Sequence, residues 1–200
     1  KVQFTNVYIK ETIMTSKPKN LIIKALQHLG AILFFLFATI IFFSPQFFDG
    51  KQLPQSDVMQ YQGASQDLRK YYNEDGESSA WTGGMFSGMP SYQIGIWGGS
   101  PNFLDYLEAP LRALGGTTAG PVFAGMLMAY ILFLILGFNI PMAMFGAMAY
   151  SLSSYNIILL DAGHATKAWA LAYMPIVVGG ILAMYKNKYL IGGLCMALGL

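Results

Sequence analysis

The chain contains the run Thr118-Ala-Gly-Pro-Val-Phe-Ala-Gly-Met-Leu-Met-Ala-Tyr-Ile-Leu-Phe-Leu-Ile-Leu-Gly-Phe138, in which no side chain is charged. A helix needs about 20 apolar residues to cross the hydrocarbon core of a bilayer. Pro121 falls in the first turn of the expected helix, where a backbone N–H would have no helical partner. The run therefore predicts a membrane-spanning helix and decides the fold class.

Further apolar runs on both sides extend this pattern. We predict a first span over 25–43, a third over 141–160, a fourth over 168–185 and part of a fifth over 189–200. The last run is shorter than a full span, so we expect the chain to stop inside that helix. The expected fold is all-α, a polytopic transmembrane helical bundle in which 118–200 hold helices two to four and part of a fifth.

The composition agrees with a membrane protein. Hydrophobic residues make up 54% of the chain and charged residues only 11%, whereas soluble domains carry about 25% charged residues. The single cysteine, Cys195, excludes an internal disulfide. The sequence has neither a basic stripe nor a zinc-type Cys/His spacing, so we expect no nucleic acid partner.

The N-terminal residues 1–24 are expected to form a cytoplasmic stub. Residues 1–13 have little pattern, and Met14 is followed by lysines like a genuine start, so we expect 1–13 not to be native. A cleaved signal peptide is the competing interpretation. Because residues 44–47 offer no small-x-small cleavage site, an uncleaved anchor is favoured.

The charge distribution predicts the orientation. Five lysines stand on one side without an acid: Lys17, Lys19, Lys24, Lys186 and Lys188. Since lysines favour the cytoplasmic side of a membrane, the N-terminus is expected in the cytoplasm. The polar segments 44–117 and 161–167 then share the extracytoplasmic face, where they can build one site.

The long extracytoplasmic loop, 44–117, carries two expected interfacial helices. Apolar residues recur at helical spacing over 58–72 and again over 102–114. Between them lies the glycine- and aromatic-rich segment 81–92, which starts at Trp81. Its aromatic side chains are suited either to stacking on a sugar or to anchoring at lipid headgroups, and both interpretations stay open.

Asp57 precedes the first of these helices. With Gln60 three residues later, it resembles a capping box in which Asp57 is the N-cap and Gln60 the N3 residue. A catalytic or metal-binding carboxylate is the other interpretation. The two roles are compatible.

The segment Asp161-Ala-Gly-His-Ala-Thr-Lys167 predicts an anion site. A helix that begins near Ala165 would carry His164 and Lys167 at its N-terminus, which has a partial positive charge and where acidic residues are usual. A bound phosphate is therefore expected to compensate for this positive charge. Snorkelling of the lysine to headgroups is the alternative. Tyr155 and Asn156 lie just before this segment, at a depth where polar groups must face protein or a wet cavity.

Taken together, these residues resemble the YfhO-like bacterial membrane proteins, a family of the GT-C-type glycosyltransferase superfamily. The resemblance rests on Gln55-Ser-Asp57 after an uncleaved first span, on Trp81 with Phe86-Ser-Gly-Met-Pro90, and on Gly163-His-Ala-Thr-Lys167. It implies a GT-C-like enzyme in the bacterial inner (cytoplasmic) membrane. Such an enzyme transfers a sugar from a polyprenyl-phosphate-linked donor to an envelope glycan or protein acceptor at the outer face.

The resemblance also implies residue roles. Asp57 is the expected catalytic residue, and His164 and Lys167 are expected to bind the leaving phosphate. The residues themselves add Gln60, Trp81, Tyr155 and Asn156 as expected substrate-binding residues. The chain lacks an Asp-x-Asp or Glu-x-Asp pair, so no cofactor and no metal ligand is assigned. A transporter or flippase of lipid-linked sugars, and a non-catalytic scaffold of an envelope or secretion assembly, remain as alternatives.

Overall fold

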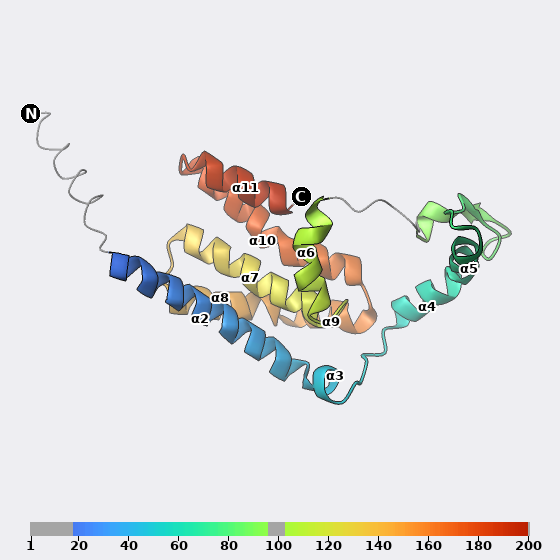
Figure 1. Ribbon diagram of the computed structural model, residues 1–200, viewed down its shortest axis with the longest axis horizontal. Helices are drawn as coiled ribbons and strands as arrows, with labels where there is room; N and C mark the ends of the chain where they lie inside the picture. Colours follow the sequence, from blue (N-terminus) through green and yellow to red (C-terminus); the bar gives the residue numbers. More distant parts are fainter. Residues whose placement is uncertain (1–17, 96–102, 200) are drawn as a thin grey trace, which may run out of the picture.

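The computed structural model describes residues 18–95 and 103–199, which fold almost entirely as α-helices (Figure 1). The helices are α2 (Pro18–Phe42), α3 (Ser44–Phe48), α4 (Ser56–Ala64), α5 (Gln66–Asp75), α6 (Phe103–Ala113), α7 (Ala119–Leu136), α8 (Ile140–Ser151), α9 (Ser154–Ala162), α10 (Ala165–Tyr185) and α11 (Tyr189–Gly199). Strands β1 (Trp81–Thr82) and β2 (Met89–Pro90) pair in an antiparallel hairpin, followed by the 3₁₀ helix η1 (Ser91–Gln93). The expectation for residues 1–13 lies outside the described part.

Three helices of the described chain are long and apolar enough to cross a membrane: Leu21–Phe42 within α2, Ala119–Leu136 and Ala165–Tyr185. Helices α8 and α9 meet the same criteria only as a pair, bent by 40° at a short break. Helix α11 is apolar but shorter. The chain is therefore a helical membrane protein, with a fourth span if the bent pair counts as one.

The third span predicted over 141–160 corresponds to the two helices α8 and α9, because the helix breaks at Leu152 and Ser153. The side chain of Asn156 compensates for the break. Its Nδ2 donates to the carbonyl oxygens of Tyr150 at 2.9 Å and Ser151 at 3.4 Å, which are among those left without helical donors at the end of α8.

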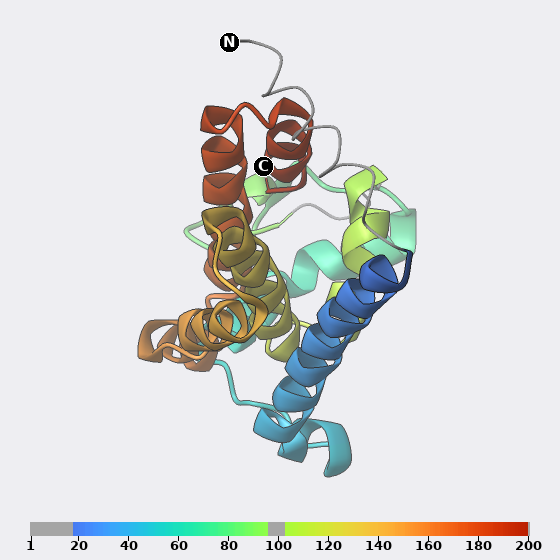
Figure 2. The same cartoon turned by 90° about the vertical axis from the view of Figure 1, so that its left-hand side faces the viewer.

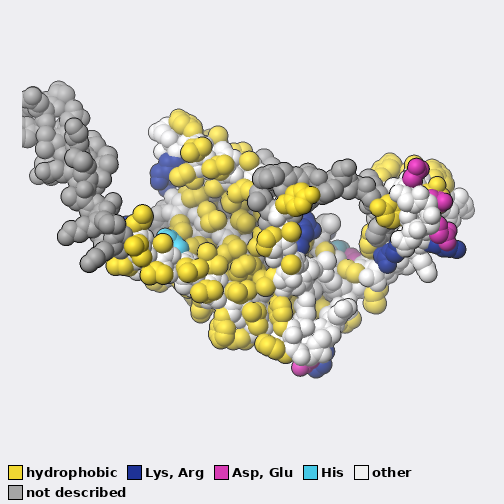
Figure 3. Space-filling model, viewed as in Figure 1, with side chains coloured by type: hydrophobic (Ala, Val, Ile, Leu, Met, Phe, Trp, Pro, Cys, Tyr) yellow, Lys and Arg dark blue, Asp and Glu magenta, His cyan; other side chains and the backbone are white. Residues whose placement is uncertain are grey.

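Helix α7 forms the centre of the bundle and packs against α2, α8 and α10. Small residues allow close approach: Ala143, Ala147 and Ser151 of α8 are all buried. Helix α11 folds back beside α10 (Figure 2). Hydrophobic side chains cover most of the face of the bundle seen in Figure 3, as expected for helices that face lipid.

The segment 44–117 differs from the prediction in one respect. The helix expected over 58–72 is divided into α4 and α5 at the buried Ser65. The two helices carry the β1–β2 hairpin away from the bundle (Figure 1). The hairpin is attached to α5, since the Thr82 hydroxyl donates to the carboxylate of Asp67. Helix α6 returns the chain to α7. It also contacts α10, because the Arg112 guanidinium of α6 lies 5.0 Å from the ring centroid of Trp169 in α10.

Candidate functional site

Gln55 holds the start of α4 against the bundle. Its side chain is buried, its Nε2 donates to the carbonyl oxygen of Leu160 at 2.7 Å, and its Oε1 accepts from the Thr117 hydroxyl at 3.2 Å. The Ser56 hydroxyl adds a longer bond to the carbonyl oxygen of Ala162 at 3.4 Å. The start of α4 is thereby docked on the end of α9 and the α9–α10 connection, more than a hundred residues away in sequence.

Gly163 makes this close approach possible. It ends α9 in the left-handed conformation, with a φ of +92°. A Cβ at this position would lie 3.0 Å from the Cβ of Gln55 and 3.2 Å from the backbone nitrogen of Val58. Glycine alone meets both demands without strain.

The docking brings Asp57 and His164 together. The Oδ2 of Asp57 lies 2.9 Å from the Nδ1 of His164, and the two side chains are 43% and 39% exposed. Asp57 stands in the first turn of α4, where the helix dipole favours a carboxylate. His164 is the N-cap residue of α10 but makes no capping bond with its side chain. The pair joins an acid and a base from separate polar segments at one surface point.

The capping box predicted for Asp57 and Gln60 is wrong. The N-cap of α4 is Gln55, and no side-chain bond caps this helix. The carboxylate of Asp57 contacts His164 instead of the helix N–H groups. Gln60 is exposed one turn after Asp57, and residues three apart share a face of a helix.

Helix α10 begins at Ala165, and its first turn contains no acid. Lys167 is exposed in that turn. Over residues 18–95 and 103–199, the structure gives Lys167 no ion-pair partner. Asp161 neither caps α10 nor pairs with Lys167, because it belongs to the last turn of α9. Lys167 therefore leaves a cation available near His164.

Three sequence-predicted site residues lie elsewhere. Trp81 belongs to the β1–β2 hairpin, beyond α4 and α5 from the bundle (Figure 1), and its indole ring covers Gly88. Tyr155 is 60% exposed near the start of α9, at the opposite end of that helix from Asp161. Asn156 faces the bundle interior, where it bonds to the end of α8. The structure does not bring these residues to Asp57.

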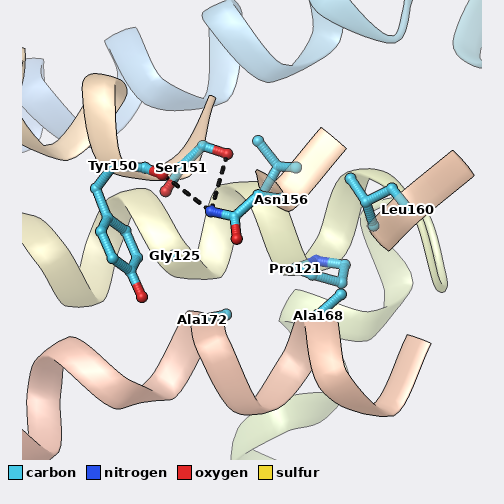
Figure 4. A pocket seen from close by; sticks show the side chains of 9 residues that line it. Pro121, Gly125, Tyr150, Ser151, Asn156, Leu160, Ala168 and Ala172 are labelled. Carbon is cyan, nitrogen blue, oxygen red and sulfur yellow. Dashed lines mark hydrogen bonds between the residues drawn. The ribbon is translucent and has the colours of Figure 1, made fainter. Parts of the chain in front are cut away.

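Asn156 lines a small interior cavity of about 10 Å³ between α7, α8–α9 and α10 (Figure 4). The Ser151 hydroxyl also faces this cavity and, within the described chain, has no hydrogen-bond partner. This volume is close to the minimum for one water molecule. Asn156 thus faces protein and a cavity that is too small for a substrate.

Larger grooves flank the start of α4. A polar groove of about 550 Å³ lies between α3, α4 and the α6–α7 connection, and an apolar groove of about 440 Å³ lies between the end of α2 and α9. The linker residues Gln52, Leu53 and Pro54 line both. Sequence reasoning missed Gln46, Thr117 and Thr118 of the polar groove, because single polar residues beside a span form no motif.

Within residues 18–95 and 103–199, no group of three or more His, Cys, Asp or Glu side chains is placed to hold a metal ion. The comparisons with known proteins add no assignment, since no family, curated protein or solved structure matches this chain.

Proposed function

We propose that this protein is a YfhO-like membrane glycosyltransferase of the GT-C type. It transfers a sugar from a polyprenyl-phosphate-linked donor to an acceptor of the cell envelope, at the outer face of the bacterial inner membrane. The observation that carries the proposal is the 2.9 Å contact between Asp57 and His164. It unites the carboxylate of the outer loop with the basic start of α10.

In this proposal the acceptor is a hydroxyl group. The Oδ2 atom of Asp57 is engaged by His164, while Oδ1 has only a long contact of 3.5 Å with the Ser56 hydroxyl. Oδ1 accepts the proton as the acceptor oxygen forms its bond to C1 of the donor sugar. The bond between C1 and the phosphate oxygen breaks, and polyprenyl phosphate leaves with the electron pair.

His164 and Lys167 balance the charge that develops on the phosphate. Asp57 holds the imidazole through Nδ1, which leaves Nε2 to interact with the leaving group. Lys167 stands three residues after His164, and N-cap and N3 side chains are neighbours at a helix start. A cation and a helix N-terminus together favour a phosphate.

The apolar groove supports a lipid-linked donor. Its walls include Phe42 and Phe43 at the end of α2, and Ile157 and Ile158 of α9. Asp161 is also part of its lining and lies three residues before His164. A chain of isoprene units in this groove would keep its phosphate close to the basic segment.

Transfer can be measured with undecaprenyl phosphate that carries radiolabelled glucose, mannose or N-acetylglucosamine. The acceptor is supplied as envelope membranes from cells lacking their own copy of the protein. The wild-type protein should move label from the lipid fraction to polymer with at least one donor. Asp57→Asn should lower this rate about 100-fold or more, because the general base is lost.

The matched control is Asp75→Asn, which alters an exposed carboxylate at the end of α5. It should transfer at the wild-type rate. Transfer by Asp57→Asn at that same rate would refute the proposal.

The bent α8–α9 pair favours one alternative, because broken helices are typical of transporters. A flippase would move the lipid-linked sugar across the membrane without forming a glycosidic bond. Reconstituted liposomes distinguish the two functions. The flippase would be favoured if the Asp57→Asn protein still moved the lipid-linked sugar across the bilayer and no glycosidic bond were formed.

A further inference from the structure

The polar groove at the start of α4 has a lining chemistry that the transfer step does not use. Its volume of about 550 Å³ is within the usual range of small-molecule sites. Four glutamines and two threonines supply its polar side chains: Gln46, Gln52, Gln55, Gln62, Thr117 and Thr118. Among the described residues that line it, none is charged.

One wall of this groove is held rigidly. The Thr118 hydroxyl donates to Oε1 of Gln46 at 2.6 Å, and the Thr117 hydroxyl donates to Oε1 of Gln55 at 3.2 Å. Gln46 also donates to the carbonyl oxygen of Gly115 at 3.2 Å. Two consecutive threonines thus fix two glutamines from separate segments, so that little side-chain entropy remains to be lost when a ligand binds.

The other two glutamines are available to a ligand. Gln52 and Gln62 are exposed, and in the described parts of the chain their side-chain amides have no hydrogen-bond partner. Each amide offers two donors and one acceptor with two lone pairs. Both amides can therefore pair with hydroxyl groups, which also donate and accept.

The absence of charge from this lining selects against ionic ligands. A phosphate, a uronic acid or a nucleotide would lose water here and meet no cation. Leu53, Val58 and Met59 add apolar surface for the C–H faces of a sugar ring. A ligand that matches this lining has neutral hydroxyl groups beside apolar faces, and an uncharged carbohydrate has both.

We propose that this groove binds an uncharged glycan chain, the acceptor of the transfer. The role as acceptor rests on the proposed function, whereas glycan binding itself does not. Gln55 and Val58 of the lining stand two residues before and one residue after Asp57, so a bound chain contacts the same turn of α4 that carries the carboxylate. None of the described residues that line the groove is aromatic, so stacking on a ring contributes nothing there and the Kd is expected near 1 mM.

Binding is tested by saturation-transfer NMR with the Asp57→Asn protein in detergent, which separates binding from catalysis. The probes are the neutral trisaccharides maltotriose, cellotriose and mannotriose, with trigalacturonate as the charged counterpart. At least one neutral trisaccharide should bind in the millimolar range, and trigalacturonate should not. The double variant Gln52→Ala/Gln62→Ala should weaken neutral binding about tenfold.

The matched control is Gln66→Ala, an exposed glutamine of α5 outside the groove, which should leave binding unchanged. A second variant, Gln52→Lys/Gln62→Lys, should also lose the neutral trisaccharide. No neutral binding, equal binding by the double alanine variant, or preference for trigalacturonate would each overturn the proposal. Glycan binding without any transfer by the wild-type protein would instead refute the glycosyltransferase and retain the groove.

Discussion

The Tyr150 hydroxyl of α8 donates a hydrogen bond of 2.7 Å to the carbonyl oxygen of Leu171 in α10. Pro175 follows this carbonyl by four residues inside the same helix. A proline has no N–H, so Leu171 lacks its normal helical donor. The bond from Tyr150 replaces that donor, which explains how α10 continues through a proline inside the bundle.

Replacing Tyr150 by Phe should therefore destabilise the protein by about 1 kcal/mol, because a partly buried carbonyl loses its donor. Unfolding in detergent measures this free energy. The loss should shrink in a Pro175→Ala background, where residue 175 again supplies an N–H. Tyr155→Phe is the control, since that side chain is 60% exposed. Equal losses in both backgrounds would show that the bond is not a substitute for the helical donor.

Gly163→Ala should release the start of α4 from the end of α9. Gly163 and Gly137 both end helices with positive φ values, +92° and +98°, but a Cβ at Gly137 would meet no atom within 4 Å. Gly137→Ala should cost about 1 kcal/mol of conformational strain alone. Gly163→Ala adds a clash with Gln55 and Val58, so hydrogen exchange in α4 should accelerate only in this variant. Identical exchange in the two variants would contradict the docking.

The hairpin should respond to acid through Asp67. The hydrogen bond from Thr82, with a further bond from the backbone N–H of Leu68, holds the pKa of Asp67 below its ordinary value of 3.8. Because folding lowers the pKa, the ionised carboxylate stabilises the folded hairpin. This contribution is fully present at a pH above the ordinary value and disappears as the pH falls through the folded-state pKa. Thr82→Val should raise the pKa, as measured by NMR titration of the carboxyl carbon. The control Thr166→Val, at an exposed threonine, should leave the pKa of Asp67 unchanged. An unchanged pKa of Asp67 in Thr82→Val would refute the assigned hydrogen bond.

The orientation can be tested with single cysteines. In a Cys195→Ala background, Gln66→Cys should react with a membrane-impermeant maleimide on intact spheroplasts. Lys188→Cys should react only after permeabilisation, since the lysines predict a cytoplasmic side there. The reverse labelling pattern would place Asp57 and His164 on the cytoplasmic face.

The sequence predicted the helices that local signals define. The apolar length of 118–138 corresponds to α7, and the basic turn at Ala165 marks the start of α10. The break in the third span was missed, because it depends on Asn156 reaching back to two carbonyl oxygens. A run of Ser, Tyr and Asn residues does not reveal whether their side chains bond across a break.

The capping of α4 also depends on distant residues. Locally, Asp57 and Gln60 match a capping box, but Gln55 is fixed by Leu160 and Thr117 and becomes the N-cap, so the helix starts two residues earlier. The position of Trp81 follows from the contact between Thr82 and Asp67. Such contacts between separate segments are not encoded in spacing, which is why the candidate site could be predicted only in part.

The central claim is that Asp57 and His164 act as one unit in sugar transfer. The most direct test is a double-mutant cycle with Asp57→Asn, His164→Ala and their combination, measured as transfer of labelled sugar from undecaprenyl phosphate. Residues that act as a unit have strongly non-additive effects. Each single variant should lose most of the activity, and the combination should be no slower than Asp57→Asn alone. Reductions that multiply, or a single variant with the wild-type rate, would contradict the claim.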